Sequence, residues 1–177
     1  MGRDITLQRV EEDIAAGNLG RARDRLHGLV WQYPDDLSLR CRLAEVYWQL
    51  GFPAMAGCYW YLEEPVTPAM QQAHAEFERS CGKDPLCILF RLKFRGNIET
   101  LPEYARLRLK GLQEECERKH GRYPVFVAKR REWRSSGTVH RQNLENLGCL
   151  LLLLAVLALA IIGFGTVLSR VIQWWNR

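Results

Sequence analysis

One uncharged stretch near the end of the chain limits what these 177 residues can fold into. Residues 147–168 read LGCLLLLLAVLALAIIGFGTVL and contain no charged side chain. These 22 residues would form a helix of about 33 Å, which matches a bilayer hydrocarbon core of about 30 Å. A helix that is apolar all round needs lipid or a large protein around it, and the 146 preceding residues are too few. The sequence therefore predicts a transmembrane helix over 147–168 and a short external tail over 169–177.

Positive charge is distributed unevenly around this stretch. Residues 1–128 carry 18 cations and 18 anions, so the net charge of +5 comes from residues 129–177. The positive-inside rule predicts that the N-terminal body lies in the cytoplasm, because five cations immediately precede the stretch. We expect a single-pass membrane protein whose basic linker, residues 126–146, lies at anionic lipid head groups. The flanking cations are Lys129, Arg130, Arg131, Arg134 and Arg141.

The neutral body argues against nucleic acid as the partner. It has no basic stripe with interleaved aromatic residues, which nucleic-acid-binding surfaces usually show. The first residues, MGRDITLQRV, contain no apolar segment typical of a secretory signal. The six cysteines form no CxxC pair and no regular framework, as expected for a reducing compartment.

An internal repeat with an offset of 34 residues predicts the fold of the body. Gly17 aligns with Gly51, and Ala22 aligns with Ala56. Glycine permits a tight turn between paired helices, and a small alanine lets two helices cross closely. A period of 34 is typical of the tetratricopeptide repeat, which is a helix–turn–helix unit. We therefore expect an all-α body.

The domain organisation follows from this repeat. The body, residues 1–125, is predicted to be a short solenoid of α-hairpins with two recognisable units. Two units are fewer than the three or so that usually stabilise a solenoid, so further helices are expected to complete it. The predicted segments are unit one at 3–36, unit two at 37–70, helices at 69–80, 86–94 and 103–119, and a basic linker from about residue 124.

The residues at the repeat positions also resemble the tetratricopeptide family. The first unit closes with YPDD, similar to the turn that ends such repeats, and the second carries Leu43, Ala44 and Tyr47 where the family has these residue types. Through GNLGRARDRLHGLV and AEVYWQLG…AGCYWYL, residues 5–125 also resemble a small bacterial family of unknown function. This resemblance implies a helical fold and a bacterial inner membrane, and it assigns no activity.

The sequence contains no motif for catalysis or for cofactor binding. P-loop, GxSxG and HExxH patterns are absent, and the four histidines have no second His or Cys at metal-ligand spacing. Acidic runs alternate with arginine on helical stretches, as solvated helix faces do. We expect a non-enzymatic protein that binds no cofactor and no metal.

A groove along the first helix of each hairpin is the predicted binding surface. In the tetratricopeptide family this helix lines the concave side, where a membrane-associated protein partner is expected to bind. Trp48 has two interpretations: it anchors a partner, or it packs against the third helical segment. The candidate groove residues are Glu11, Ile14, Cys41, Glu45, Trp48 and Gln49. The predicted function is a membrane-anchored adaptor or scaffold.

A second hypothesis places the function in the membrane span itself. Ala155, Ala158 and Gly165 are small enough to permit close contact between helices. The chain would then be a small subunit or effector of a membrane complex, with homo-oligomers formed through the span. Crosslinking of the isolated span in membranes separates this hypothesis from the adaptor.

Overall fold

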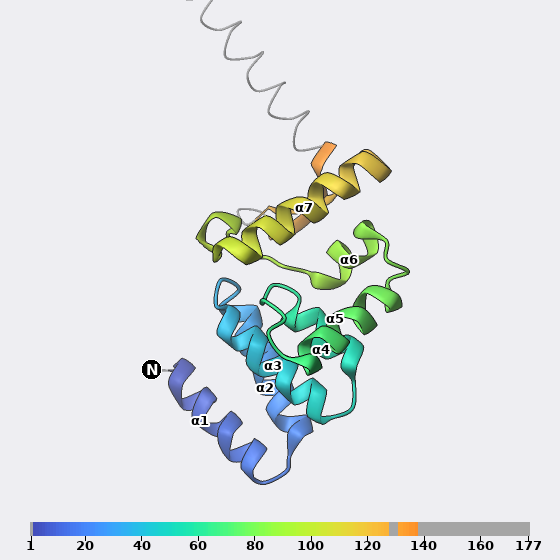
Figure 1. Cartoon of the computed structure of the whole chain (residues 1–177). Helices are drawn as coiled ribbons and strands as arrows, with labels where there is room; N and C mark the ends of the chain where they lie inside the picture. Colours follow the sequence, from blue (N-terminus) through green and yellow to red (C-terminus); the bar gives the residue numbers. More distant parts are fainter. Residues whose placement is uncertain (1, 128–130, 138–177) are drawn as a thin grey trace, which may run out of the picture. The chain divides into compact units, whose positions relative to one another are not determined.

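The computed structural model describes residues 2–127 and 131–137, and these residues are mainly α-helical (Figure 1). The helical class predicted for the body is therefore confirmed. The elements are α1 (Gly2–Ala15), α2 (Leu19–Gln32), α3 (Leu37–Gln49), α4 (Pro53–Trp60), α5 (Pro68–Ser80), α6 (Pro85–Leu92), the short 3-10 helix η1 (Ile98–Thr100), α7 (Glu103–His120), β1 (Pro124–Val127) and β2 (Glu132–Ser135).

Two helical hairpins, α1–α2 and α3–α4, occupy the positions of the 34-residue repeat. Gly17 and Gly51 lie in their turns with φ of +74° and +78°, a left-handed conformation that glycine adopts without steric cost. Ala22 and Ala56 are fully buried. The structure therefore has the glycine turns and the buried alanines at the positions that the 34-residue offset predicts.

Local signals explain where the next helices begin. Pro68 starts α5, and the Thr67 hydroxyl accepts a hydrogen bond from the Met70 amide at 3.2 Å. Asp84 caps α6 in the same way, accepting from the Cys87 amide at 3.1 Å. A side-chain acceptor at the N-cap satisfies an amide that has no partner within the helix, and proline at the first helical position loses no hydrogen bond.

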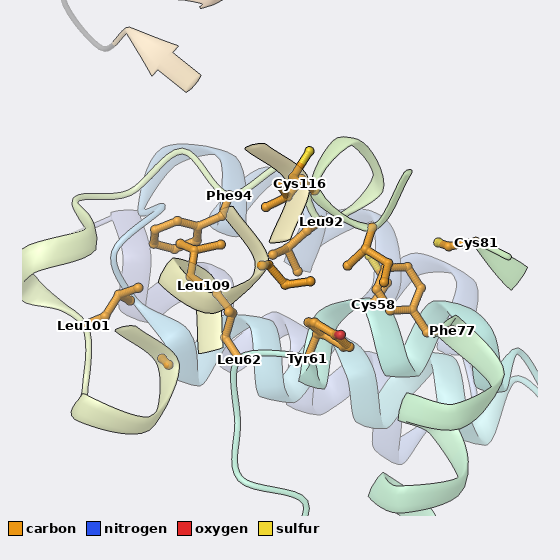
Figure 2. Close-up of a cluster of buried hydrophobic side chains, with 14 of the residues drawn as sticks. Cys58, Tyr61, Leu62, Phe77, Cys81, Leu92, Phe94, Leu101, Leu109 and Cys116 are labelled. Atoms are coloured by element: carbon orange, nitrogen blue, oxygen red, sulfur yellow. The ribbon is translucent and has the colours of Figure 1, made fainter. Parts of the chain in front are cut away.

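The core consists of two clusters of buried side chains. The repeat cluster fills the space among α1 to α5, and the C-terminal cluster lies among α4 to α7 (Figure 2). The backbones of α4 and α5 approach each other closely, because a Cβ atom at Gly57 would lie 2.0 Å from the Ala73 carbonyl oxygen. Glycine is therefore required at this position in the middle of a helix.

A buried arginine connects the two clusters. Arg40 of α3 is 4% exposed, and its Nη2 donates to the carbonyls of Cys58 and Leu92, both at 3.3 Å. Those carbonyls lie near the C-terminal ends of α4 and α6, where helix carbonyls lack intrahelical partners. Burial lowers the pKa of Arg40. One side chain of α3 thus holds α6 onto the repeat.

The described part of the predicted basic linker is folded, contrary to the expectation of a linker. β1 and β2 pair as an antiparallel hairpin in which Phe126 lies opposite Trp133. Their ring centres are 5.3 Å apart, and such cross-strand aromatic pairs stabilise hairpins. The run of valine and aromatic residues in PVFV favours a strand, a signal that the basic composition obscured.

Several predictions for the C-terminal region lie outside the described residues. They include the membrane span at 147–168, the tail at 169–177, the small residues Ala155, Ala158 and Gly165, and the cations Lys129, Arg130 and Arg141. Within the part of the chain that is described, no helix has both the length and the apolar character that a membrane crossing requires.

Candidate functional site

The residues predicted for the groove lie on α1 and α3, where one arginine connects the two acids. The Arg42 Nε donates to Glu11 at 3.0 Å, and its Nη1 donates to Glu45 at 2.6 Å. All three side chains are partly or largely accessible to solvent. We call this group of Glu11, Arg42 and Glu45 the α1–α3 face, in which two carboxylates share one guanidinium.

The other groove residues divide between the core and the surface. Trp48 is partly buried, packs against the repeat cluster and lies 6.1 Å from Trp60, measured between ring centres. Ile14 and Cys41 are likewise partly buried against this cluster, and burial raises the pKa of the Cys41 thiol. Gln49 is exposed. Trp48 therefore takes part in packing while keeping an accessible portion.

A cleft of about 830 Å³, which the sequence did not predict, lies between the α2–α3 turn, the segment that joins α6 to η1, and the β-hairpin. Its walls combine aromatic, cationic and anionic side chains. They include Trp31, Asp35, Arg95, Glu99, Phe126 and Arg131. We refer to it below as the cleft.

A stacked arginine and tryptophan form one wall of the cleft. The Arg95 guanidinium carbon lies 3.2 Å from the centre of the Trp31 ring and 5.7 Å from that of Phe126. Both distances are within cation–π range. Trp31 is nevertheless 69% exposed, which is unusual for so large an apolar side chain. Partial burial lowers the pKa of Arg95, yet a guanidinium remains charged at neutral pH.

Hydrogen bonds to Asp35 fix the loop that carries Arg95. Its Oδ1 accepts from the Asn97 amide at 2.5 Å and from the Thr100 hydroxyl at 3.5 Å. A Cβ atom at Gly96 would lie 2.6 Å from the same oxygen, so the loop approaches the turn closely only with glycine at this position. The Asp35 carboxylate therefore holds the loop that carries Arg95 in place.

The two arginines of the cleft form no ion pair with the two carboxylates that line it. Glu99 pairs with Lys110 at 3.3 Å, and Asp35 is occupied by the loop. Across residues 2–127 and 131–137, neither Arg95 nor Arg131 forms an ion pair with a carboxylate. The cleft thus presents two guanidinium groups beside aromatic surface.

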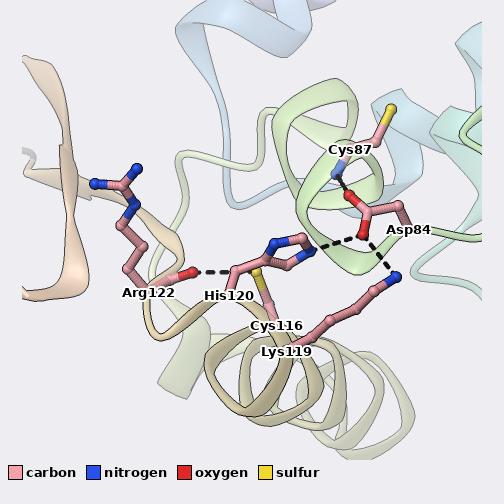
Figure 3. Close-up of polar contacts among 6 residues, drawn as sticks. All are labelled: Asp84, Cys87, Cys116, Lys119, His120 and Arg122. Carbon is pink, nitrogen blue, oxygen red and sulfur yellow. Dashed lines mark hydrogen bonds and ion pairs between the residues drawn. The ribbon is translucent and has the colours of Figure 1, made fainter.

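A third polar cluster joins α6 to the end of α7 (Figure 3). Asp84 Oδ1 accepts from Lys119 Nζ at 3.0 Å and lies 2.7 Å from His120 Nε2. These hydrogen bonds lower the pKa of Asp84 to about 2. Cys116 lies nearby, but its thiol donates to the Arg122 carbonyl at 3.3 Å, and burial raises its pKa. A protonated thiol is a poor nucleophile, so this cluster is suited to holding two helices together.

One partly buried and one buried histidine, His27 and His74, lie within the helical body. His27 lies between two tyrosines, with Nε2 2.7 Å from the Tyr47 hydroxyl and Nδ1 3.4 Å from the Tyr59 hydroxyl. Burial lowers the pKa of both His27 and His74. No group of three or more His, Cys, Asp or Glu side chains in the described ranges is arranged to hold a metal ion.

The sequence offered only weak signals for the cleft. Trp31 precedes the YPDD turn, and Arg95-Gly96-Asn97 indicated no more than a break between helices. Of the cations expected at the membrane, Arg131 lines the cleft and Arg134 pairs with Glu132 at 2.6 Å.

Comparison of the chain with curated proteins and with solved structures gave no match. A family model matches residues 1–169, and the chain therefore belongs to the family described as a family of unknown function (DUF6584).

Proposed function

We propose that this chain is a non-enzymatic protein-binding module of tetratricopeptide-like α-hairpins, anchored in a bacterial inner membrane by a helix over 147–168. The observation that carries the proposal is the repeated hairpin, with glycine turns at Gly17 and Gly51 and buried alanines at Ala22 and Ala56. Stacked helical hairpins form extended surfaces that commonly bind other proteins. The link from this architecture to binding is an analogy at the level of the fold.

The α1–α3 face is the first binding surface of this proposal. Glu11 and Glu45 share the single guanidinium of Arg42, which leaves the group with an excess of one negative charge. Their side chains are 54% and 40% exposed, so a cation of the partner can reach them. Trp48 adds partly accessible aromatic surface on α3, a residue type that is frequent in interface hot spots.

The anchor would place this surface next to partners in or on the same membrane. Restriction to the bilayer raises the local concentration of both proteins and strengthens a weak contact without any added interaction. The uncharged stretch 147–168 and the cations that precede it support a cytoplasmic body. If this is correct, the intact chain stays in vesicles during a carbonate wash, and the chain without residues 147–177 is released.

Quantitative affinity purification from detergent-solubilised membranes tests the binding function. The variant Glu11→Gln/Glu45→Gln removes both acids of the α1–α3 face. Its control, Glu114→Gln/Glu115→Gln, removes two exposed acids of α7 and has the same net charge. We expect a defined set of proteins to be lost from the first variant and kept by the control.

Two results would contradict the proposal. An identical set of proteins with all three chains would show that the α1–α3 face does not bind them. Oligomers formed by the isolated span, together with no capture by the body, would favour the subunit of a membrane complex instead. Unchanged circular dichroism of each variant shows that the comparison concerns binding and not folding.

A further inference from the structure

We propose that the cleft binds an acidic linear segment of a partner protein, with carboxylates at Arg95 and Arg131 and an apolar side chain against Trp31 and Phe126. This site is separate from the α1–α3 face. It rests on the proposed function only in taking the ligand to be a protein segment.

The charge of the ligand follows from the ion pairs around the cleft. The two acidic residues that line the cleft already have partners. Glu99 forms an ion pair with Lys110 at 3.3 Å, and Asp35 accepts a hydrogen bond from the Asn97 amide at 2.5 Å. The guanidinium groups of Arg95 and Arg131 have no carboxylate partner in the described ranges. A planar guanidinium binds a carboxylate through two parallel hydrogen bonds, so each of these arginines is available to a carboxylate of the ligand.

The apolar part of the ligand follows from the aromatic walls. Trp31 remains 69% exposed under Arg95, and Phe126 lines the same cleft. A small inorganic anion would leave this aromatic surface in water, whereas a peptide can cover it with a leucine or phenylalanine beside an acidic residue. A flat lipid surface does not fit a concave site of about 830 Å³. An acidic peptide can contact both the arginines and the aromatic surface of the cleft.

The cleft is organised before any ligand arrives. The two hydrogen bonds to Asp35 and the close approach at Gly96 fix the loop that carries Arg95. The ring of Trp31 already holds the Arg95 guanidinium. A site whose side chains are ordered in advance loses less conformational entropy on binding.

Selection from a displayed library of random twelve-residue peptides tests this inference. The bait is the full chain in a non-ionic detergent, and Arg95→Gln and Trp31→Ala are compared with it. Arg79→Gln and Phe90→Ala are the matched controls, because they remove an exposed arginine of α5 and an exposed aromatic ring of α6. Affinities of the selected peptides are then measured by fluorescence anisotropy at two salt concentrations.

We expect the selected peptides to combine Asp or Glu with a neighbouring aromatic or aliphatic residue. Their affinity should fall about tenfold or more with Arg95→Gln and with Trp31→Ala, stay unchanged with both controls, and weaken as salt rises. Selection of no peptides, of non-acidic peptides, or of peptides that bind Arg95→Gln equally well would overturn the inference. Stronger binding of the chain to phosphatidylserine vesicles than to any peptide, lost in Arg95→Gln, would also overturn it.

These outcomes are distinguishable from failure of the proposed function. The α1–α3 face is intact in Arg95→Gln, so capture that depends on Glu11 and Glu45 can persist when the cleft binds nothing. Thermal unfolding of each variant shows whether a loss of affinity comes from the site or from the fold.

Discussion

The first five helices and the segments that follow them are held together in different ways. In the repeat half, α1 to α5, helices meet through apolar and small side chains, and Gly57 lies close to the backbone of Ala73. In the C-terminal half, residues 81–135, a second apolar cluster packs against α4 and α5, and individual polar side chains also attach segments that are distant in sequence. Asp35 and Arg40 hold it to the repeat, and Asp84 joins its two helices. Loss of one polar contact in the second half is therefore expected to loosen it locally, and the cleft lies where the two halves meet.

The largest effect is expected at the crossing of α4 and α5. Gly57→Ala would place a Cβ atom 2.0 Å from the Ala73 carbonyl oxygen, and such overpacking costs about 2–3 kcal/mol. Gly111→Ala in α7 meets nothing within 4 Å and should stabilise the helix by up to about 1 kcal/mol. Urea unfolding of both variants measures the difference. A Gly57→Ala variant with the same free energy of unfolding as the wild type would show that α4 and α5 are not tightly packed against each other.

A smaller and more local effect is expected at the junction of the halves. Asp35→Ala removes the acceptor of the Asn97 amide and the Thr100 hydroxyl, at a cost of about 1–2 kcal/mol. Hydrogen exchange should accelerate at residue 97 while amides within α3 stay protected. Faster exchange throughout α1 to α4 would mean that the two halves unfold as one unit.

Acid should loosen the C-terminal half through Asp84. The pKa of Asp84 is lowered to about 2 by Lys119 and His120, below the ordinary value of 3.8. This carboxylate therefore stabilises the fold above pH 3.8, and the contribution is lost as the pH falls toward 2. Asp84→Asn should lower Tm at pH 6, and its difference from the wild type should vanish near pH 2. A difference that does not depend on pH would rule out this ionic contribution.

The stability of the repeat half should depend on pH in a higher range, and this is the smallest of the expected effects. Burial and the nearby charge of Arg23 lower the pKa of His27 below 6.5, while Asp24 opposes them. The folded state then favours the neutral imidazole. The contribution of His27 to stability is therefore fully present above pH 6.5 and decreases as the pH falls below this value. Tm should decrease from pH 7.5 to pH 5.5, and less so in His27→Gln. An identical slope in this variant would exclude His27 as the source.

The sequence predicted the repeat half because its signals are local. The glycine turns and the capped starts of α5 and α6 each involve residues close together in the chain, and the 34-residue offset repeats one such local pattern. The hairpin at 124–135 was missed because its four-residue strands lie in a basic segment that suggested a linker. The cleft could not be predicted, because it brings Trp31 next to Arg95 by folding, and no periodic pattern connects positions so far apart.

The α1–α3 face shows the same limit for a predicted site. Spacing placed Glu11 and Glu45 on the first helices of the two hairpins, where the structure also has them. Their shared partner, Arg42, was not foreseen, because an arginine between two acids also suits an ordinary solvated helix. Which charges remain unmatched can be decided only from the ion pairs of the folded chain.

Site-specific photo-crosslinking in living cells tests the central claim, that this chain binds a partner protein in the cleft, most directly. A photoreactive amino acid replaces Gln32, which lines the cleft, or Leu107, which is 62% exposed on α7. We predict a discrete crosslinked polypeptide from position 32 that disappears when Arg95→Gln is added, and none from position 107. Absence of any product from position 32, or the same products from both positions, would contradict the claim.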